Sequence, residues 1–266
     1  MSGSAERRWL AFDTSTDVLS LAVARGQQVW GQTLPGGAQA SSGLIPAVLA
    51  LLDEAGMPLA SLDAIVFGRG PGSFTGLRTA CAVAQGLAFG VDLPVLPVDT
   101  LLAVAEEARW SQVQAGALAP DTALSVLALL DARMDEVYSA VYHWQPVPGA
   151  SHGLWQEAAP LQVGAPEKLQ LPEGRMVLQA GNAFAAYGDR LFQGVSGGLR
   201  CEALPTAAAL LRLAPALWAQ GLAVPAEQAM PLYIRDKVAN TTAERDAMKA
   251  QALQAQSDLA KATAQP

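Results

Sequence analysis

The sequence predicts an α/β protein built from two similar domains, and three observations carry this expectation. With 266 residues, 51% of them hydrophobic and 15% charged, the chain has enough apolar side chains for one large core or two modest ones. In the first half, apolar positions alternate between the two-residue period of strands and the 3.6-residue period of helices. A strand-turn-strand pattern whose first strand ends on Asp occurs twice, about half a chain apart.

The chain is expected to begin with three strands and an amphipathic helix. The strands are predicted at residues 9–13, 19–24 and 29–33. The polar residues 13–17 supply the turn between the first two strands. Four apolar residues then recur at helical spacing: Ile45, Val48, Leu49 and Leu52. Pro46 is expected in the first turn of this helix, and Gly56 marks its end.

The rest of the N-terminal half alternates between strand and helix. Strands are expected at residues 64–68 and 95–98, and helices at residues 76–90 and 100–109. Three strands followed by helix, strand, helix, strand and helix is the element order of a ribonuclease-H-like domain.

The opening pattern returns after a softer stretch at residues 111–121. The apolar run that ends on Asp131 leads through a short turn into a second run at residues 136–142, as the run that ends on Asp13 leads into residues 19–24. Two further elements are predicted, a strand at residues 176–180 and a helix at residues 207–220 that Pro215 should kink or divide. These elements predict a duplicated, smaller second domain.

The predicted boundaries are 1–112 for the first domain, 113–239 for the second and 240–266 for a flexible tail. The tail consists mainly of Ala, Gln, Lys and Glu, and it has too few large apolar residues to offset the entropy lost on ordering.

Charge and cysteine content narrow the class of protein. The 24 acidic and 17 basic residues give a net charge of −7, so we expect the chain to bind nucleic acid weakly or to leave that contact to a partner. Cys81 and Cys201 belong to no C-x-x-C pair, which is typical of the reducing cytoplasm. The apolar run after Arg7 and Arg8 is too short for a signal peptide, and no run is long enough to span a membrane.

A glycine-rich segment at residues 68–78 leads from a predicted strand into a helix. Such a loop can direct backbone N–H groups at an anion, and the helix N-terminus adds partial positive charge. The segment lacks the Gly-Lys-Ser/Thr end of a Walker loop and the spacing of a nucleophile elbow. The favoured explanation is that the glycines supply the backbone angles and close packing of a tight turn, with phosphate contact as the alternative. The candidate nucleotide or anion contacts are Asp13, Thr14, Ser15, Gly70, Gly72 and Ser73.

Asp13 and Asp131 each end a strand of the repeated pattern. A carboxylate at this position can hold a metal–nucleotide, or it can stabilise the turn that follows. Stabilisation of the turn is favoured, because the sequence indicates no second acidic residue close to either aspartate. His143 and His152 are the only histidines and form no metal-binding pair. We therefore predict no metal site and no catalytic residue.

Five segments together resemble the TsaB (YeaZ) family. They are residues 10–16, 68–78, 84–88, 131–138 and 231–235, and the resemblance extends from about residue 9 to 239. It implies two tandem ribonuclease-H-like domains of the actin/Hsp70/sugar-kinase superfamily, with mixed central sheets flanked by helices. It also implies a non-catalytic, cytoplasmic subunit that pairs with the related protein TsaD and, with the ATPase TsaE, supports transfer of threonylcarbamoyl from its adenylate to the adenosine beside the tRNA anticodon.

The resemblance further implies that TsaD holds the metal and the active site. Residues 40–46, which correspond to the TsaD segment with a metal-binding histidine pair, contain no histidine. No intrinsic cofactor is expected, although ATP or ADP with Mg can belong to the partner complex. The resemblance also implies that the chain alone can form a homodimer through the surface used for TsaD.

That surface is expected on the helices at residues 45–55 and 76–90, where small side chains permit close approach. The predicted contacts are Ile45, Val48, Leu49, Leu52, Leu77, Ala80, Cys81 and Ala84. Ala84→Arg is predicted to abolish binding to TsaD without unfolding the chain.

Two enzyme alternatives remain open at this point. The glycine-rich loop and Asp13 would suit an ATP-dependent phosphotransferase or ATPase of the actin-like class, with Gly181 and Asn182 as the one hint of an adenosine loop. A metallopeptidase is the other alternative, against which the missing metal ligands argue.

Overall fold

The computed structural model describes residues 6–147, 153–170, 177–191 and 199–235. The predicted tail at residues 240–266 lies outside this part of the chain. The described residues up to Ile234 belong to one compact unit. Among them, no helix is both long and apolar enough to cross a lipid bilayer.

The first sheet has the strand order β3-β2-β1-β4-β5. Its strands are β1 (Arg8–Asp13), β2 (Val18–Arg25), β3 (Gln28–Pro35), β4 (Ala64–Gly70) and β5 (Val95–Asp99). β1 is antiparallel to β2 and parallel to β4, which in turn is parallel to β5. β1 and β4 lie in the interior of the sheet and are apolar and buried almost throughout, because helices cover both faces.

The second sheet repeats this arrangement. Its strands are β6 (Leu124–Asp131), β7 (Val137–Pro146), β8 (Gly153–Gly164), β9 (Val177–Gly181) and β10 (Leu199–Glu202). The order β8-β7-β6-β9-β10 and the directions of pairing match those of the first sheet strand for strand. The predicted duplication and the fold class of two mixed, helix-flanked sheets are thereby confirmed.

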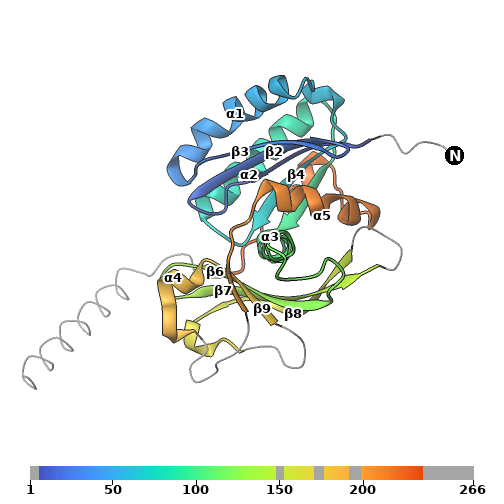
Figure 1. Cartoon of the computed structure of the whole chain (residues 1–266). Helices are drawn as coiled ribbons and strands as arrows, with labels where there is room; N and C mark the ends of the chain where they lie inside the picture. The colour runs from blue at the N-terminus through green and yellow to red at the C-terminus, as the bar shows by residue number, and fades with distance from the viewer. Residues whose placement is uncertain (1–5, 148–152, 171–176, 192–198, 236–266) are drawn as a thin grey trace, which may run out of the picture. The chain divides into compact units, whose positions relative to one another are not determined.

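Four longer helices make the layers around the sheets (Figure 1). α1 (Ala40–Glu54) and α2 (Phe74–Gly90) pack together on one face of the first sheet. α5 (Ala207–Ala219) covers its other face. α3 (Thr100–Gln114) contributes to that face too, and its side chains also pack against the second sheet. The short helix α4 (Ala183–Tyr187) lies on the far face of the second sheet. α3 is therefore the element that both sheets share.

Three expectations about individual elements are corrected. β8 lies in a Pro- and Gly-rich stretch where no strand was predicted. Its Pro160 sits at an irregularity in the pairing with β7, where a strand tolerates proline. Pro46 lies one turn deeper in α1 than expected. Pro215 does not divide α5, which continues through it with its buried apolar face packed along β1 and β2.

Candidate functional site

The turn after β1 is built around the buried carboxyl group of Asp13. Oδ1 of Asp13 accepts hydrogen bonds from the backbone N–H of Ser15 at 2.8 Å and from Ser15 Oγ at 2.6 Å. Oδ2 is buried and has no hydrogen-bond partner. Burial raises the pKa of Asp13 to about 6, and the two bonds from Ser15 lower it only in part.

The glycine-rich loop packs directly on this turn. Thr14 Oγ1 donates to the carbonyl oxygen of Gly76 at 2.7 Å, and the N–H of Ser73 donates to the carbonyl oxygen of Ser15 at 2.7 Å. A Cβ on Gly76 would lie 1.9 Å from the carbonyl oxygen of Thr14. A Cβ on Gly68 would lie 1.8 Å from Asp13 Oδ2. Glycine is required at both positions because the two segments are in contact.

The segment at residues 229–234 closes the same loop from the other side. The N–H of Leu232 donates to the carbonyl oxygen of Arg69 at 2.7 Å. Gly70 has φ +125°, and a Cβ there would lie 2.6 Å from the carbonyl oxygen of Leu232. The ring of Tyr233 contacts that of Phe74, with centroids 5.4 Å apart, and the Tyr233 hydroxyl accepts from Arg78 Nε at 3.1 Å. The late sequence motif at residues 231–235 is thus explained in part by the glycine-rich motif that it covers.

The predicted nucleotide contacts come together, but as a packed contact between segments. Asp13, Thr14, Ser15 and Gly70 are buried, Gly72 is half-buried and Ser73 is exposed. The N–H groups of Gly70, Ser73 and Gly76 donate to Thr100 Oγ1, the Ser15 carbonyl and Ser73 Oγ respectively. These three N–H groups are therefore bonded within the chain and are not directed at a phosphate, so the glycines are explained by packing.

Asp131 occupies the equivalent position in the second sheet and is fully bonded. Its Oδ1 lies 2.8 Å from both the N–H of Arg133 and the hydroxyl of Tyr187. Arg133 pairs with Asp131 Oδ2 at 3.2 Å and with Asp17 Oδ2, in the first turn, at 2.8 Å. The two equivalent turns are therefore bridged by one guanidinium group. Spacing along the chain could not predict this contact, which joins residues more than a hundred positions apart.

The loop after Asp131 holds an uncommon backbone conformation. Arg133, Met134 and Asp135 have φ values of 59°, 55° and 64°, in the left-handed region that non-glycine residues seldom adopt. Both oxygens of Asp135 accept from Arg190, at 2.6 and 2.8 Å. These bonds lower the pKa of Asp135 and help to hold the strained loop in place.

Gly181 and Asn182 also have a structural explanation. A Cβ on Gly181 would lie 1.7 Å from the carbonyl oxygen of Leu129. The side chain of Asn182 accepts from the N–H of Asp131 at 2.9 Å. The pair joins the end of β9 to β6, and no feature of it is specific to adenosine.

His143 and one cavity of the second sheet have no part in the contact between the loop and the Asp13 turn. His143 Nδ1 is 2.9 Å from Ser125 Oγ, and His152 is outside the described residues. Within the described part of the chain, no three His, Cys, Asp or Glu side chains are grouped to hold a metal ion. A cavity of about 510 Å³ on the outer face of the second sheet has Ser139 and His143 in its wall and none of the predicted contacts.

The predicted partner surface needs a correction in its residues. Ile45 and Leu49 are 43% and 53% exposed on α1. The other six predicted contacts are buried side chains of α1 and α2: Val48, Leu52, Leu77, Ala80, Cys81 and Ala84. Because Ala84 is fully buried, Ala84→Arg would place a charge in the core, and we therefore expect this variant to unfold instead of staying folded.

Exposed apolar side chains that the sequence did not single out lie at the two ends of α2. Phe74 is 39% exposed and Phe89 is 80% exposed. The Arg78 guanidinium lies 3.8 Å from the Phe74 ring centroid, an i,i+4 pair that helical spacing could have indicated.

Comparison with known proteins gives concordant matches. The family model TsaD, tRNA N6-adenosine threonylcarbamoyltransferase, matches residues 36–243. The tRNA threonylcarbamoyladenosine biosynthesis protein TsaB of Haemophilus influenzae is 34% identical over 86% of this chain and 94% of its own length. The TsaB of Escherichia coli is 35% identical over 87% and 96%.

A solved structure agrees with these relatives. YeaZ from Pseudomonas aeruginosa superimposes with a TM-score of 0.73 and 36% identity, over 85% of this chain and 99% of that one. With the repeated five-stranded sheets and the contact between the glycine-rich loop and the Asp13 turn, these matches show that the chain belongs to the TsaB (YeaZ) family of tRNA threonylcarbamoyladenosine biosynthesis proteins.

Proposed function

We propose that this chain is a non-catalytic subunit in tRNA threonylcarbamoyladenosine biosynthesis. It binds TsaD and, with TsaE, supports transfer of threonylcarbamoyl from its adenylate to the adenosine beside the tRNA anticodon. Family membership supports the pathway. The observation that carries the non-catalytic role is the glycine-rich loop, whose space is filled by the Asp13 turn and by Leu232.

The proposed partner surface is the exposed side of α1, together with the neighbouring exposed side of α2. Ile45 and Leu49 stand one turn apart on α1 and both point away from the core. Leu44 and Val48, the preceding residue in each case, are fully buried. Apolar side chains that a helix exposes in this way gain from burial against a partner. The same surface would serve a homodimer when TsaD is absent.

Other features are consistent with this assignment. The net charge of −7 favours contact with tRNA through TsaD. A cytoplasmic location, and ATP or ADP with Mg at the complex, stay predictions. No contact in the described residues favours a phosphotransferase or a metallopeptidase. Calorimetry with Mg-ATP on the isolated chain should give no binding heat, and saturable heat would favour the phosphotransferase.

The partner surface can be tested with paired charge substitutions. The variant Ile45→Arg/Leu49→Arg should weaken binding to TsaD at least about tenfold, a loss of about 1.4 kcal/mol or more, because two desolvated guanidinium groups would replace apolar contacts. Binding is measured by calorimetry and folding by circular dichroism. The matched control is Leu222→Arg, which alters an apolar residue of similar exposure beyond α5.

The control should bind TsaD like the wild type. If the double variant is folded and binds TsaD with unchanged affinity, the surface has been assigned wrongly. If both variants lose affinity equally, charge in general and not this surface is responsible.

A further inference from the structure

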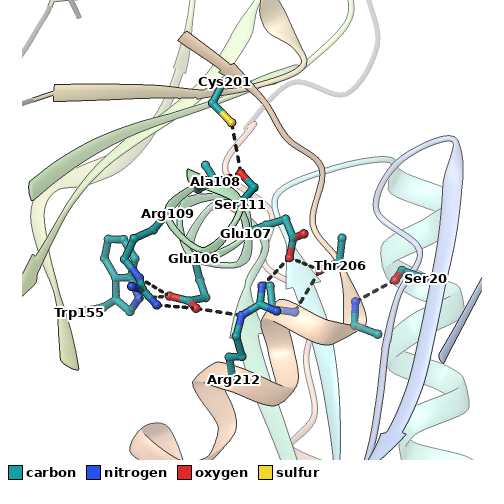
Figure 2. A network of polar contacts seen from close by, with 12 residues as sticks. Ser20, Glu106, Glu107, Ala108, Arg109, Ser111, Trp155, Cys201, Thr206 and Arg212 are labelled. Carbon is teal, nitrogen blue, oxygen red and sulfur yellow. Dashed lines mark hydrogen bonds and ion pairs between the residues drawn. The ribbon is translucent and has the colours of Figure 1, made fainter. Parts of the chain in front are cut away.

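A cluster of charged and aromatic side chains joins α3 to elements of both sheets (Figure 2). Its members are Glu106, Glu107, Arg109, Trp155, Thr206 and Arg212, and we call it the α3 cluster. Glu106 is buried on α3 and the adjacent Glu107 is half-buried; apart from Thr100 and Arg109, the other buried residues of this helix are apolar. Charged residues are seldom buried unless they are paired, so this concentration requires an explanation.

Glu106 is the centre of the α3 cluster. Its Oε2 accepts from Arg109 Nε and from Trp155 Nε1, each at 3.0 Å. Its Oε1 accepts from Arg109 Nη2 at 3.1 Å and from Arg212 Nε at 2.9 Å. Trp155 belongs to β8 in the second sheet, whereas Arg212 belongs to α5, which packs on the first. One carboxylate therefore bonds to both sides of the molecule.

Glu107 reinforces the connection to α5. Its Oε2 accepts from Arg212 Nη2 at 2.5 Å and from Thr206 Oγ1 at 2.7 Å. Thr206 Oγ1 also caps α5 by accepting from the N–H of Ala209 at 3.0 Å. The first turn of α5 is in turn bonded to the first sheet, because the N–H of Ala207 donates to Ser20 Oγ on β2 at 2.8 Å.

The two arginines are packed as well as paired. The Arg109 guanidinium lies 4.4 Å from the ring centroid of Trp144 on β7, and that of Arg212 lies 5.2 Å from Trp110 on α3. Side-chain exposure falls to 4% for Glu106 and 10% for Arg109. Two carboxylates face two guanidinium groups, so the cluster carries no net charge, and removal of one member would leave a partner buried without its counter-charge.

The geometry of the α3 cluster indicates that it fixes the relative orientation of the two sheets and does more than hold them together. Apolar side chains of α3 already hold the two sheets together, but such contacts are non-directional, and packed helices can slide by small amounts. Hydrogen bonds from three elements to one carboxylate are directional, and a rotation of either sheet about α3 would lengthen some of them. Buried polar groups can thus select one arrangement without adding much stability.

We propose that the α3 cluster is an orientation lock, which fixes the angle between the two sheets by bonding α3 to α5 on one side and to β8 on the other. The chain then acts as a rigid platform with no hinge between its two sheets. This inference does not depend on the proposed partner or pathway.

The test measures the spread of inter-sheet distances in the full chain. Spin labels are placed on Ser42→Cys in α1 and Gln162→Cys in β8, both exposed positions, while the native Cys81 and Cys201 are buried. Glu106→Gln keeps the shape of the side chain but removes its charge. It should broaden the distance distribution and make exchange of α5 amide hydrogens about tenfold faster.

Trp155→Phe is the second variant, because it removes the N–H donor to Glu106 and keeps an aromatic ring, although a smaller one, at the same position. It should broaden the distribution too, and it decides the question if Glu106→Gln does not fold. The matched control is Glu167→Gln, which breaks the exposed pair between Glu167 and Arg190. An unchanged width in the folded Trp155→Phe variant, or equal broadening in the control, would overturn the lock.

Discussion

Two glycine-to-alanine substitutions in α2 test whether the glycine-rich loop is a packing device. Gly76 is buried in the first turn of the helix, and an added Cβ would lie 1.9 Å from the carbonyl oxygen of Thr14 and 2.9 Å from its carbon. Gly86 is exposed in the same helix, and an added Cβ there would meet no atom within 4 Å. The same chemical change is therefore made in a filled space and in an open one.

The expected free energies have opposite signs. Overpacking at Gly76 costs about 1–3 kcal/mol. Separating the loop from the turn would also weaken the bonds from Thr14 Oγ1 to Gly76 and from Ser73 to Ser15, each worth about 1 kcal/mol. After the gain of roughly 1 kcal/mol that alanine brings to a helix, Gly76→Ala should destabilise the fold by about 2–4 kcal/mol. Gly86→Ala should stabilise it by about 0.5–1 kcal/mol.

Urea denaturation followed by circular dichroism measures both variants. The midpoint should fall for Gly76→Ala and rise slightly for Gly86→Ala, with an unchanged slope if only stability changes. A Gly76→Ala protein as stable as the wild type would refute the reasoning. It would mean that the space between loop and turn is open, and a phosphate site there would have to be considered again.

Two further predictions concern buried polar groups. The folded-state pKa of Asp13, about 6, lies above its ordinary value of 3.8, so the folded state binds this proton more tightly than the unfolded state. The protonated carboxyl therefore contributes to the free energy of unfolding below about pH 4, and this contribution is lost as the pH rises through about 6. Asp13→Asn should therefore gain about 3 kcal/mol relative to the wild type between about pH 3.5 and about pH 7.5, measured as urea midpoints; parallel pH curves would contradict this. Tyr187→Phe removes the hydroxyl that contacts Asp131 Oδ1 and the Glu136 carbonyl, and thermal denaturation should show a loss of about 1–2 kcal/mol. Unchanged stability would mean that the loop at residues 131–136 is held without this bond.

The glycine-rich segment shows how far a sequence motif leads. Its position between a strand and a helix was predicted correctly, since hydrophobic periodicity is a local property. The sequence could not predict which residues pack against this loop, because Ser15 and Leu232 approach it from positions about 60 residues before and 160 residues after it. Packing and phosphate contact require the same residue type, so composition alone could not separate them.

The partner surface shows a second limit of prediction from sequence, which concerns the exposure of individual side chains. Val48 and Leu49 are neighbours of similar hydrophobicity, and helical spacing placed both in one apolar set. Only the packing of α1 on the first sheet and on α2 separates them, since it buries Val48 completely and leaves Leu49 half exposed.

The sequence by itself determined the α/β class, most of the elements and the duplication, because these follow from periods of two and 3.6 residues and from a pattern that occurs twice. The tertiary structure alone decided the strand β8, the bridge from Arg133 to Asp17 and the α3 cluster. Each of these depends on contacts between residues distant in sequence. The free energy of such a contact depends on burial and on geometry in three dimensions, and neither can be calculated from the spacing of residues along the chain.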